Sequence, residues 1–167
     1  MAKVLKLFTY PDPLLKEISK EVTDFSKELK SLTDDMFKTM YENSGIGLAA
    51  PQVGILKRIV VIDLQEDDKK VPLIFINPQI IEACGSTTFE EGCLSVPGYH
   101  EVVKRKKDIT VKFQDLEGKE QVINATGLLA ICLQHEIDHL NGILFVDQIS
   151  QLKKGFFKKW FKKNHSE

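Results

Sequence analysis

Cysteine is scarce in this chain of 167 residues, and its three cysteines, Cys84, Cys93 and Cys132, show no paired spacing. An odd number without such a spacing argues against a disulfide framework and favours a reducing compartment, in which thiols are available to bind metal. Long apolar runs are also lacking, since none approaches the roughly 20 residues that span a bilayer. The first residues are too polar for a secretory signal. We therefore expect a cytoplasmic protein.

Net charge is almost lacking, at -1, but it is unevenly distributed. Six lysines and one glutamate fall in residues 151–167, which therefore carry +5 and leave -6 to the rest of the chain. Hydrophobic residues make up 43% and charged residues 28% of the chain, which is typical of one globular domain. We predict a single domain over 1–150, followed by a basic amphipathic helix or tail over 151–167.

The first third of the chain contains one clear helical pattern. Apolar residues recur every three or four positions across about 24–42, at Phe25, Leu29, Leu32, Met36, Phe37 and Met40. The spacing predicts an N-terminal amphipathic helix whose stripe of Met and Phe packs in the core, and Asn43-Ser44-Gly45 ends it.

From Lys57 to about Asn124 the chain consists of short β-branched runs separated by turn residues. These runs predict strands over 58–64, 72–77, 79–82, 108–113 and 120–124, with a turn at Asn77-Pro78 and a hairpin turn across 115–119. Strands and helices do not alternate, which argues against a doubly wound parallel sheet. The predicted fold class is α+β, with antiparallel sheets packed around a central helix.

That central helix carries the most informative motif, Gln134-His135-Glu136-Ile137-Asp138-His139. Two histidines four residues apart lie on one face of a helix, one turn apart. Glu136 lies beside them, which completes an H-E-x-x-H arrangement: two nitrogen ligands for a divalent metal and a carboxylate that can take a proton from water. A solvated helical turn that happens to carry two histidines is the alternative.

The residues around the motif favour the metal site. The preceding run from Gly127 is apolar, Asn124 or Thr126 can cap its start, and Gly142 can end it. One stripe of this helix holds Leu128, Cys132, His135 and His139. The two histidines therefore point into the core, where ionisable groups need partners and a metal supplies one.

A catalytic site of this kind needs a third protein ligand. Cys93 is the best placed cysteine, because it follows Gly92 in a polar loop outside any apolar run. Cys132 lies on the helix and is expected to pack as a small hydrophobe, while Cys84 ends a strand with no motif around it. A buried thiol without a metal is the alternative for Cys93.

The segment from Gly45 to Gly54 is rich in small residues, with the sequence Gly-Ile-Gly-Leu-Ala-Ala-Pro-Gln-Val-Gly. It lacks the third glycine of a dinucleotide fingerprint and the Gly-Lys-Ser/Thr of a phosphate loop, which argues against nucleotide binding. We interpret it as a tight loop whose backbone must approach some other group closely, with Gln52 as the one polar side chain able to donate a hydrogen bond. A plain structural turn is the alternative.

Three stretches in this order resemble one family: Gly45–Gly54, Glu91-Gly-Cys-Leu-Ser95 and Gln134–His139. Together they are similar to the motifs of bacterial peptide deformylases, and Tyr10-Pro-Asp-Pro13 extends the resemblance over about 1–150. The resemblance implies that 1–150 is a catalytic deformylase domain. Such a metal-dependent hydrolase removes the N-formyl group from the N-terminal formyl-methionine of nascent polypeptides and releases formate.

The resemblance also implies how the reaction is catalysed. The metal ligands would be Cys93, His135 and His139, with Fe2+ as the physiological ion and Zn2+, Ni2+ or Co2+ able to replace it. Metal-bound hydroxide would attack the formyl carbon while Glu136 acts as general acid and base. The side-chain amide of Gln52 and the backbone N–H of Leu94 would stabilise the oxyanion.

Substrate contacts follow from the same resemblance. The backbones of Ile46 and Gly92 would pair with the substrate as an added strand, and Gly45 and Gly47 would also bind it. An apolar pocket for the methionine side chain would be lined by Leu128, Ile131, Cys132 and His135.

One position departs from the family pattern, because His100 stands where many members carry an arginine that contacts the substrate backbone. Histidine is shorter and can lose its charge near neutral pH, so we expect a weaker or pH-dependent contact. Asp138 lies off the ligand face, and we expect it either to orient a neighbouring group through Arg105 or to form a surface ion pair.

Residues 151–167 predict an amphipathic helix. About half of its wheel carries Leu152, Phe156, Phe157, Trp160 and Phe161, and most of the six lysines lie on the other half. C-terminal helices of the family can dock on the ribosome near the exit tunnel, where RNA attracts positive charge, so we expect a ribosomal partner. Packing on the protein's own body and association with a membrane surface are the alternatives. We expect a monomer without specific DNA binding.

Two other functions fit parts of the pattern. H-E-x-x-H chemistry also serves metallopeptidases that cleave internal peptide bonds, but these generally take His or Glu as third ligand, which Cys93 argues against. The second alternative function is that of a non-catalytic module that binds metal or the ribosome. The presence of Glu136, Gln52 and the Gly45–Gly54 segment argues against it.

Overall fold

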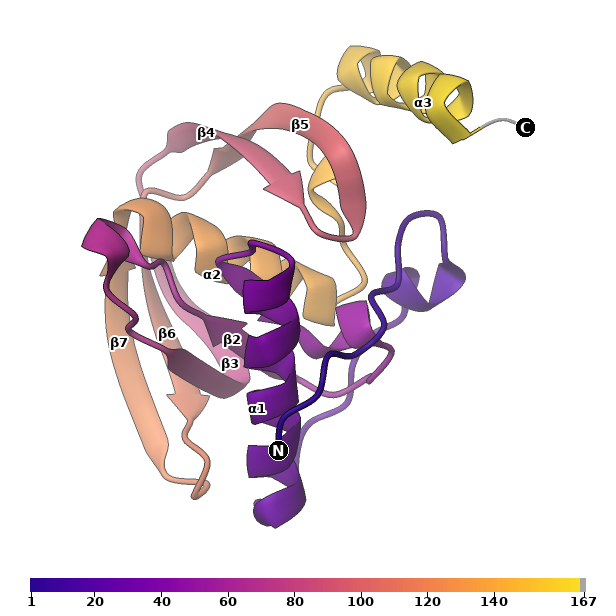
Figure 1. The fold of residues 1–167 in the computed structure, drawn as a ribbon. Coiled ribbons are helices and arrows are strands. Elements are labelled where there is room, and N and C mark those ends of the chain that lie inside the picture. Colours follow the sequence, from indigo (N-terminus) through magenta and orange to yellow (C-terminus); the bar gives the residue numbers. More distant parts are fainter. Residues whose placement is uncertain (166–167) are drawn as a thin grey trace.

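Two antiparallel sheets lie on either side of the helix that carries the histidines, α2 (Gly127–Leu140), in the computed structural model (Figure 1). The five-stranded sheet has the order β1 (Gly47–Ala49), β2 (Ile59–Ile62), β3 (Leu73–Cys84), β6 (Asp108–Gln114) and β7 (Glu120–Thr126). A separate two-stranded ribbon consists of β4 (Thr87–Cys93) and β5 (Val96–Arg105). Every strand pair is antiparallel, which confirms the predicted α+β class.

The remaining helices are α1 (Lys27–Glu42), α3 (Gln151–His165) and four short 3-10 turns, η1 (Pro13–Lys16), η2 (Ala50–Val53), η3 (Glu66–Asp68) and η4 (Phe145–Asp147). The structure describes residues 1–165, so the last two residues of the predicted tail, Ser166 and Glu167, lie outside the described residues. No helix of the described residues is long and apolar enough to cross a bilayer.

The core is built on the apolar face of α2. Leu133 and Leu140 are fully buried against the inner face of the five-stranded sheet, where they meet Val60, Phe75 and Val111. Each fully buried side chain of this size contributes about 1.5–3 kcal/mol relative to an exposed one. Because the sheet fixes α2 along its length, the side chains on the opposite face of the helix are held in place beneath the ribbon.

The C-terminal boundary of α2 agrees with the predicted signal, whereas no side chain among residues 1–165 caps its N-terminus. Thr126 occupies the N-cap position, whereas the other predicted cap, Asn124, lies within β7 and pairs with Thr110. The helix ends at Leu140 with Asn141 as its C-cap, and Gly142 follows with a φ of 73°, a left-handed conformation that favours glycine.

Helix α1 covers the other side of the short strand β1. Its buried face consists of residues three or four positions apart, Leu29, Thr33, Met36, Thr39 and Met40. The predicted helix over 24–42 is confirmed, although it begins at Lys27, because Ser26 is extended and serves as the N-cap. This packing fixes the segment that leads from the helix into the Gly45–Gly54 region.

The predicted turn between two strands at Asn77-Pro78 is wrong. The predicted strands over 72–77 and 79–82 form one strand, β3, with a register shift rather than a turn at Asn77-Pro78. Asn77 has a φ of 50°, which asparagine tolerates better than most residues, and its side chain exchanges hydrogen bonds of 2.8 and 2.9 Å with the backbone of Val22. The chain therefore kinks at Asn77 without leaving the sheet.

The polar loop predicted around Cys93 is wrong as well. Cys93 is the last residue of β4, and Leu94 and Ser95 form the turn to β5. The Gly45–Gly54 segment is likewise not only a loop, since it contains the edge strand β1 and the turn η2. Strand β4 is rich in polar residues, and β1 has only three residues and begins with a glycine, which conceals both strand patterns.

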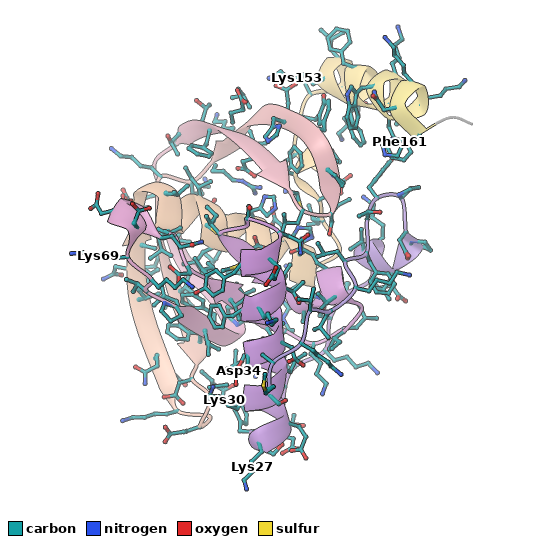
Figure 2. The ribbon with its side chains drawn as sticks, in the orientation of Figure 1. Lys27, Lys30, Asp34, Lys69, Lys153 and Phe161 are labelled. Atoms are coloured by element: carbon teal, nitrogen blue, oxygen red, sulfur yellow. The ribbon has the colours of Figure 1, made fainter. Side chains whose placement is uncertain are left out.

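Helix α3 confirms the predicted C-terminal helix but divides its apolar residues differently. Phe157, Trp160 and Phe161 face the body of the protein, and Figure 2 shows Phe161 pointing from α3 toward the N-terminal part of the chain, where its ring centroid lies 4.8 Å from that of Tyr10. Leu152 and Phe156, by contrast, are 69% and 55% exposed. The apolar half of the wheel is therefore divided: Phe157, Trp160 and Phe161 pack on the protein's own body, as the alternative proposed, whereas Leu152 and Phe156 do not.

Candidate active site

Three predicted metal ligands come together at the junction of β4 and α2. One donor atom from each of Cys93, His135 and His139 lies within 4.8 Å of the others. The Cys93 Sγ and the His139 Nε2 are 3.3 Å apart, and both histidines are buried. The helix supplies the two rings one turn apart, and the end of β4 supplies the sulfur.

Hydrogen bonds hold Cys93 in this position. The backbone N–H of Ser95 donates to the Cys93 Sγ at 3.4 Å, and the side-chain amide of Gln52 approaches the same sulfur at 3.5 Å. Gln52 is itself fixed, because its Oε1 accepts from the Ala49 N–H at 2.9 Å and its Nε2 donates to the Ser95 Oγ at 3.1 Å. The thiol and the Gln52 amide are thus preorganised side by side.

A carboxylate orients the first histidine. The His135 Nδ1 lies 2.9 Å from the Glu91 Oε1, which leaves the Nε2 of the ring directed toward Cys93 and His139. Arg105 binds the same carboxylate, and its Nη1 donates to the Asp138 Oδ2 at 2.6 Å. The expected contact between Asp138 and Arg105 is therefore present, with the Arg105 side chain only 5% exposed.

Glu136 lies in a buried position beside the three ligands. Its side chain is 5% exposed, and its Oε1 has no hydrogen-bond partner among residues 1–165. Burial, opposed by the positive charge of His135 and reinforced by the negative charge of Glu91, raises the pKa of Glu136 to about 7. A carboxyl group with such a pKa can both accept and return a proton near neutral pH.

The donor set fits a divalent metal ion. A thiol and two imidazoles are ligands that Fe2+ and Zn2+ accept, and three protein ligands leave a further coordination position. Burial, together with the charges of His135 and Arg105, lowers the pKa of His139, which favours the neutral ring that binds metal. The three cysteines are free thiols, so Cys93 is available as a ligand.

The site opens into a cavity of about 730 Å³. Every predicted substrate-binding and oxyanion residue lines it: Gly45, Ile46, Gly47, Gln52, Gly92, Leu94, His100, Leu128, Ile131 and Cys132. Cys93, His135 and Glu136 also line it, whereas His139 lies deeper, at 1% exposure. The structure thus brings together the ligands, the base and the predicted peptide contacts in one place.

Close packing explains the glycine at position 47. A Cβ placed on Gly47 would lie 2.7 Å from both the Cys132 Sγ and the Glu136 Oε2, which is closer than non-bonded atoms approach. Only a residue without a side chain lets β1 pass this close to α2. The expectation of a close backbone approach in the Gly45–Gly54 segment is thereby given a physical cause.

Sequence reasoning missed the role of Glu91. The residue belongs to the Glu91–Ser95 motif, so a signal was present, but its position beside a loop gave no partner for it. The partner is His135, 44 residues later in the chain, and the contact exists only because the ribbon folds over α2.

Comparison with known proteins agrees with this geometry. A family model described as polypeptide deformylase matches residues 4–155. A peptide deformylase of Rhizobium meliloti is 49% identical over 159 residues, which cover 94% of this chain and 91% of the relative. The solved structure of a peptide deformylase from Legionella pneumophila has a TM-score of 0.88 and 45% identity, covering 98% of this chain and 99% of that one.

A second solved structure, the peptide deformylase of Ehrlichia chaffeensis in complex with actinonin, has a TM-score of 0.91 and 42% identity, with 99% of each chain covered. The family match spans most of the chain, and both the relative and the solved structures are covered almost completely. The chain therefore belongs to the polypeptide deformylase family.

Proposed function

We propose that this deformylase removes the formyl group from the N-terminal formyl-methionine of nascent polypeptides, releasing formate, with Glu136 carrying the proton. One observation supports this assignment most directly: the buried carboxyl group of Glu136, whose Oε1 has no hydrogen-bond partner among the described residues, lies beside three clustered ligand atoms at the end of a cavity. Hydrolysis of an amide requires a group that first accepts a proton from water and then donates one to the departing amine. Glu136 is placed to do both.

Cys93, His135 and His139 would hold the metal, with Fe2+ as the proposed physiological ion and Zn2+, Ni2+ or Co2+ as substitutes. When bound, such an ion lowers the pKa of water and polarises the formyl carbonyl group. Glu91 supports His135 by accepting from its Nδ1, and the buried Glu136 Oε1 has no hydrogen-bond partner among the described residues.

Gln52 and Leu94 would stabilise the negative charge that develops on the formyl oxygen. The Gln52 side chain is buried, and Ala49 and Ser95 hold its Oε1 and one Nε2 hydrogen, so the second hydrogen, which lies toward the Cys93 Sγ at 3.5 Å, is the one that would turn to the oxyanion. Leu94 follows Cys93 directly and lines the cavity, which supports its backbone N–H as the second donor.

The peptide would lie along the cavity between β1 and β4. The backbone contacts would come from Gly45, Ile46, Gly47 and Gly92, and the methionine side chain would pack against Leu128, Ile131 and Cys132, beside His135. His100 covers Gly92 so closely that a Cβ on that glycine would lie 2.5 Å from the imidazole Cδ2. His100 would therefore contact the substrate backbone from the position where many family members use arginine.

The direct test is a pair of substitutions at Glu136, each measured for both metal content and formate release. Glu136→Ala and the isosteric Glu136→Gln are expected to retain the metal, because neither changes a ligand, and to lose turnover, because neither can transfer the proton. Casein digestion by the parent protein is measured in parallel to separate this function from that of an internal peptidase. Formate release by Glu136→Ala at the parent rate would reject the assignment.

We propose in addition that α3 docks the enzyme on the ribosome, in the cytoplasm, as a monomer. Its outer face combines the exposed Leu152 and Phe156 with four exposed lysines, Lys158, Lys159, Lys162 and Lys163. Positive charge of this kind binds the phosphate backbone of RNA. Replacing the four lysines by serine should abolish co-sedimentation with ribosomes and leave formate release from short peptides unchanged, whereas retained co-sedimentation would contradict this proposal.

A further inference from the structure

Strand β5 has two faces with different neighbours between residues 97 and 101. Pro97, Gly98 and His100 line the active-site cavity. The two residues that alternate with His100, Tyr99 and Glu101, are partly buried on the opposite face. The strand therefore forms a thin wall, with the cavity on one side and other parts of the protein on the other.

Helix α3 covers the back of this wall. The ring centroid of Tyr99 lies 5.0 Å from that of Trp160 and 4.8 Å from that of Phe157, which is 3% exposed. Two turns before Trp160, the Lys153 Nζ lies 3.2 Å from the Glu101 Oε1, and Figure 2 shows Lys153 at the start of α3. Two turns of one helix thus hold two alternate residues of β5.

Trp160 also lies over the strand next to the cavity. A Cβ added to Gly98 would come within 3.6 Å of the Trp160 Cζ2, so the indole lies on the outer side of this glycine. Gly98 has a φ of 82°, so the backbone at this point is not held in a regular strand conformation. The indole therefore closes the outer side of a backbone segment whose inner side lines the cavity.

The ribbon needs support of this kind. A two-stranded sheet is only marginally stable by itself, and β4 and β5 pair with each other but not with the five-stranded sheet. At the far end of β5, Arg105 is held by its ion pairs with Glu91 and Asp138. At the cavity end, the support comes from α3 and from η4, where the Phe145 ring stacks on Tyr99 with 6.4 Å between the ring centroids.

We infer that α3 positions the substrate-binding wall of the active site, with Trp160 and Tyr99 as the positioning residues. The inference rests on the proposed function, since it assigns 97–100 a role in holding the peptide beyond its formyl-methionine. Loss of the indole would let this segment move and would weaken peptide binding, while the ligands and Glu136, which α2 and β4 hold, would keep their geometry. The expected effect is on KM rather than on kcat.

The test compares Trp160→Ala with Phe156→Ala in the metal-loaded enzyme. Both substitutions remove one aromatic ring from α3, but Phe156 is 55% exposed on the outer face. For a formyl-methionyl tripeptide, Trp160→Ala should raise KM by about 3–10-fold with kcat within about twofold of the parent, as expected when an interaction used in substrate binding is lost. Trp160→Phe should have a KM close to that of the parent. For formyl-methionine amide, which does not reach the wall, Trp160→Ala should raise KM less than it does for the tripeptide.

Amide hydrogen exchange gives a readout that does not depend on activity. Faster exchange at residues 97–101 in Trp160→Ala, with slow exchange retained in α2, would support the inference. An unchanged KM with unchanged exchange would overturn it, as would an equal effect of Phe156→Ala, because the contact with β5 would then not matter. Absence of formate release by the parent enzyme would instead reject the proposed function, while the exchange comparison would still decide whether Trp160 positions the strand.

Discussion

The guanidinium of Arg105 donates two hydrogen bonds to the carboxylate of Glu91, from Nε at 2.7 Å and from Nη2 at 2.8 Å. Both side chains are at most 5% exposed, so the pair is shielded from water. Burial raises the pKa of Glu91, but the hydrogen bonds from Arg105 and His135 outweigh it, and the pKa lies below its ordinary value. Glu91 is therefore an anion that holds the His135 ring in one orientation.

The first prediction concerns metal affinity. Glu91→Gln and Arg105→Met should each weaken metal binding by about 10–100-fold, the usual consequence of losing a group that orients a ligand. Competition with a chelator measures this affinity directly. Lys112→Met, which removes a cation from an exposed 3.7 Å ion pair with Glu120, serves as the control. Equal affinity of all four proteins would show that the Glu91–Arg105 pair supports only the fold.

The second prediction concerns the oxyanion donor. Gln52→Ala should lower kcat by about 10²–10³-fold, the loss that accompanies removal of one such donor in comparable enzymes. Metal content should remain at the parent level, because Gln52 contacts the thiol but is not a ligand. The measurement combines formate release with metal analysis of the same preparation. A loss of metal that parallels the loss of activity would assign Gln52 to the metal site instead.

The sequence predicted the helices and the convergence of Cys93, His135 and His139, and for the helices and the two histidines the physical reason is local periodicity. His135 and His139 are one turn apart on any helix, and the apolar stripe that ends at them already indicated which face is buried. The same holds for α1, whose buried residues repeat every three or four positions. The polar residues around Cys93 and the motif predicted it as a ligand, but they did not predict that it ends a strand.

Contacts between distant segments could not be read from periodicity. The ribbon residues Glu91 and Tyr99 are determined by partners 44 and 61 residues away, His135 and Trp160. Likewise, the helical wheel of α3 does not show which of its aromatic residues the body can accept. Trp160 packs because Tyr99 and Gly98 lie opposite it, whereas Phe156, one turn earlier, is exposed.

The third prediction concerns the close passage of β1 over α2. Gly47→Ala would place a methyl group 2.7 Å from the Glu136 Oε2, so the carboxylate must shift. A displacement of about 1 Å at a catalytic group can lower the rate on the order of 10²-fold, and we expect a loss of kcat of that size. Gly155→Ala is the matched control, because no atom lies within 4 Å of the added group.

That control has its own expected result. Gly155 lies inside α3, and replacing a helical glycine by alanine at an open position stabilises a protein by about 0.5–1 kcal/mol. Steady-state kinetics and thermal unfolding of both variants give the comparison. Full activity of Gly47→Ala would show that the contact between β1 and Glu136 relaxes without consequence.

The fourth prediction concerns pH and a carboxylate far from the ligands. Asp63 is fully buried after β2 and accepts hydrogen bonds from the Tyr41 hydroxyl, from the Val71 N–H at 3.0 Å and from the Gln65 N–H at 3.1 Å. Burial raises the pKa of this carboxyl, but the hydrogen bonds from Tyr41, Val71 and Gln65 outweigh it. The pKa therefore lies below its ordinary value of 3.8.

Because the folded-state pKa of Asp63 is depressed, its ionised form stabilises the fold above pH 3.8, and this contribution is lost as the pH falls through 3.8 toward the folded-state pKa. Asp63→Asn should lower the free energy of unfolding at pH 7 by roughly 2 kcal/mol, the usual effect of losing charged hydrogen bonds. Urea unfolding of the metal-free proteins between pH 7 and pH 3 should show that the difference in unfolding free energy between parent and variant shrinks in acid.

The control is Asp34→Asn, which alters only the exposed pair with Lys30 on α1 (Figure 2) and should change the unfolding free energy little at pH 7. A difference for Asp63→Asn that stays constant down to pH 3 would show that the shape of the side chain, and not its charge, holds the Gln65–Val71 loop in place.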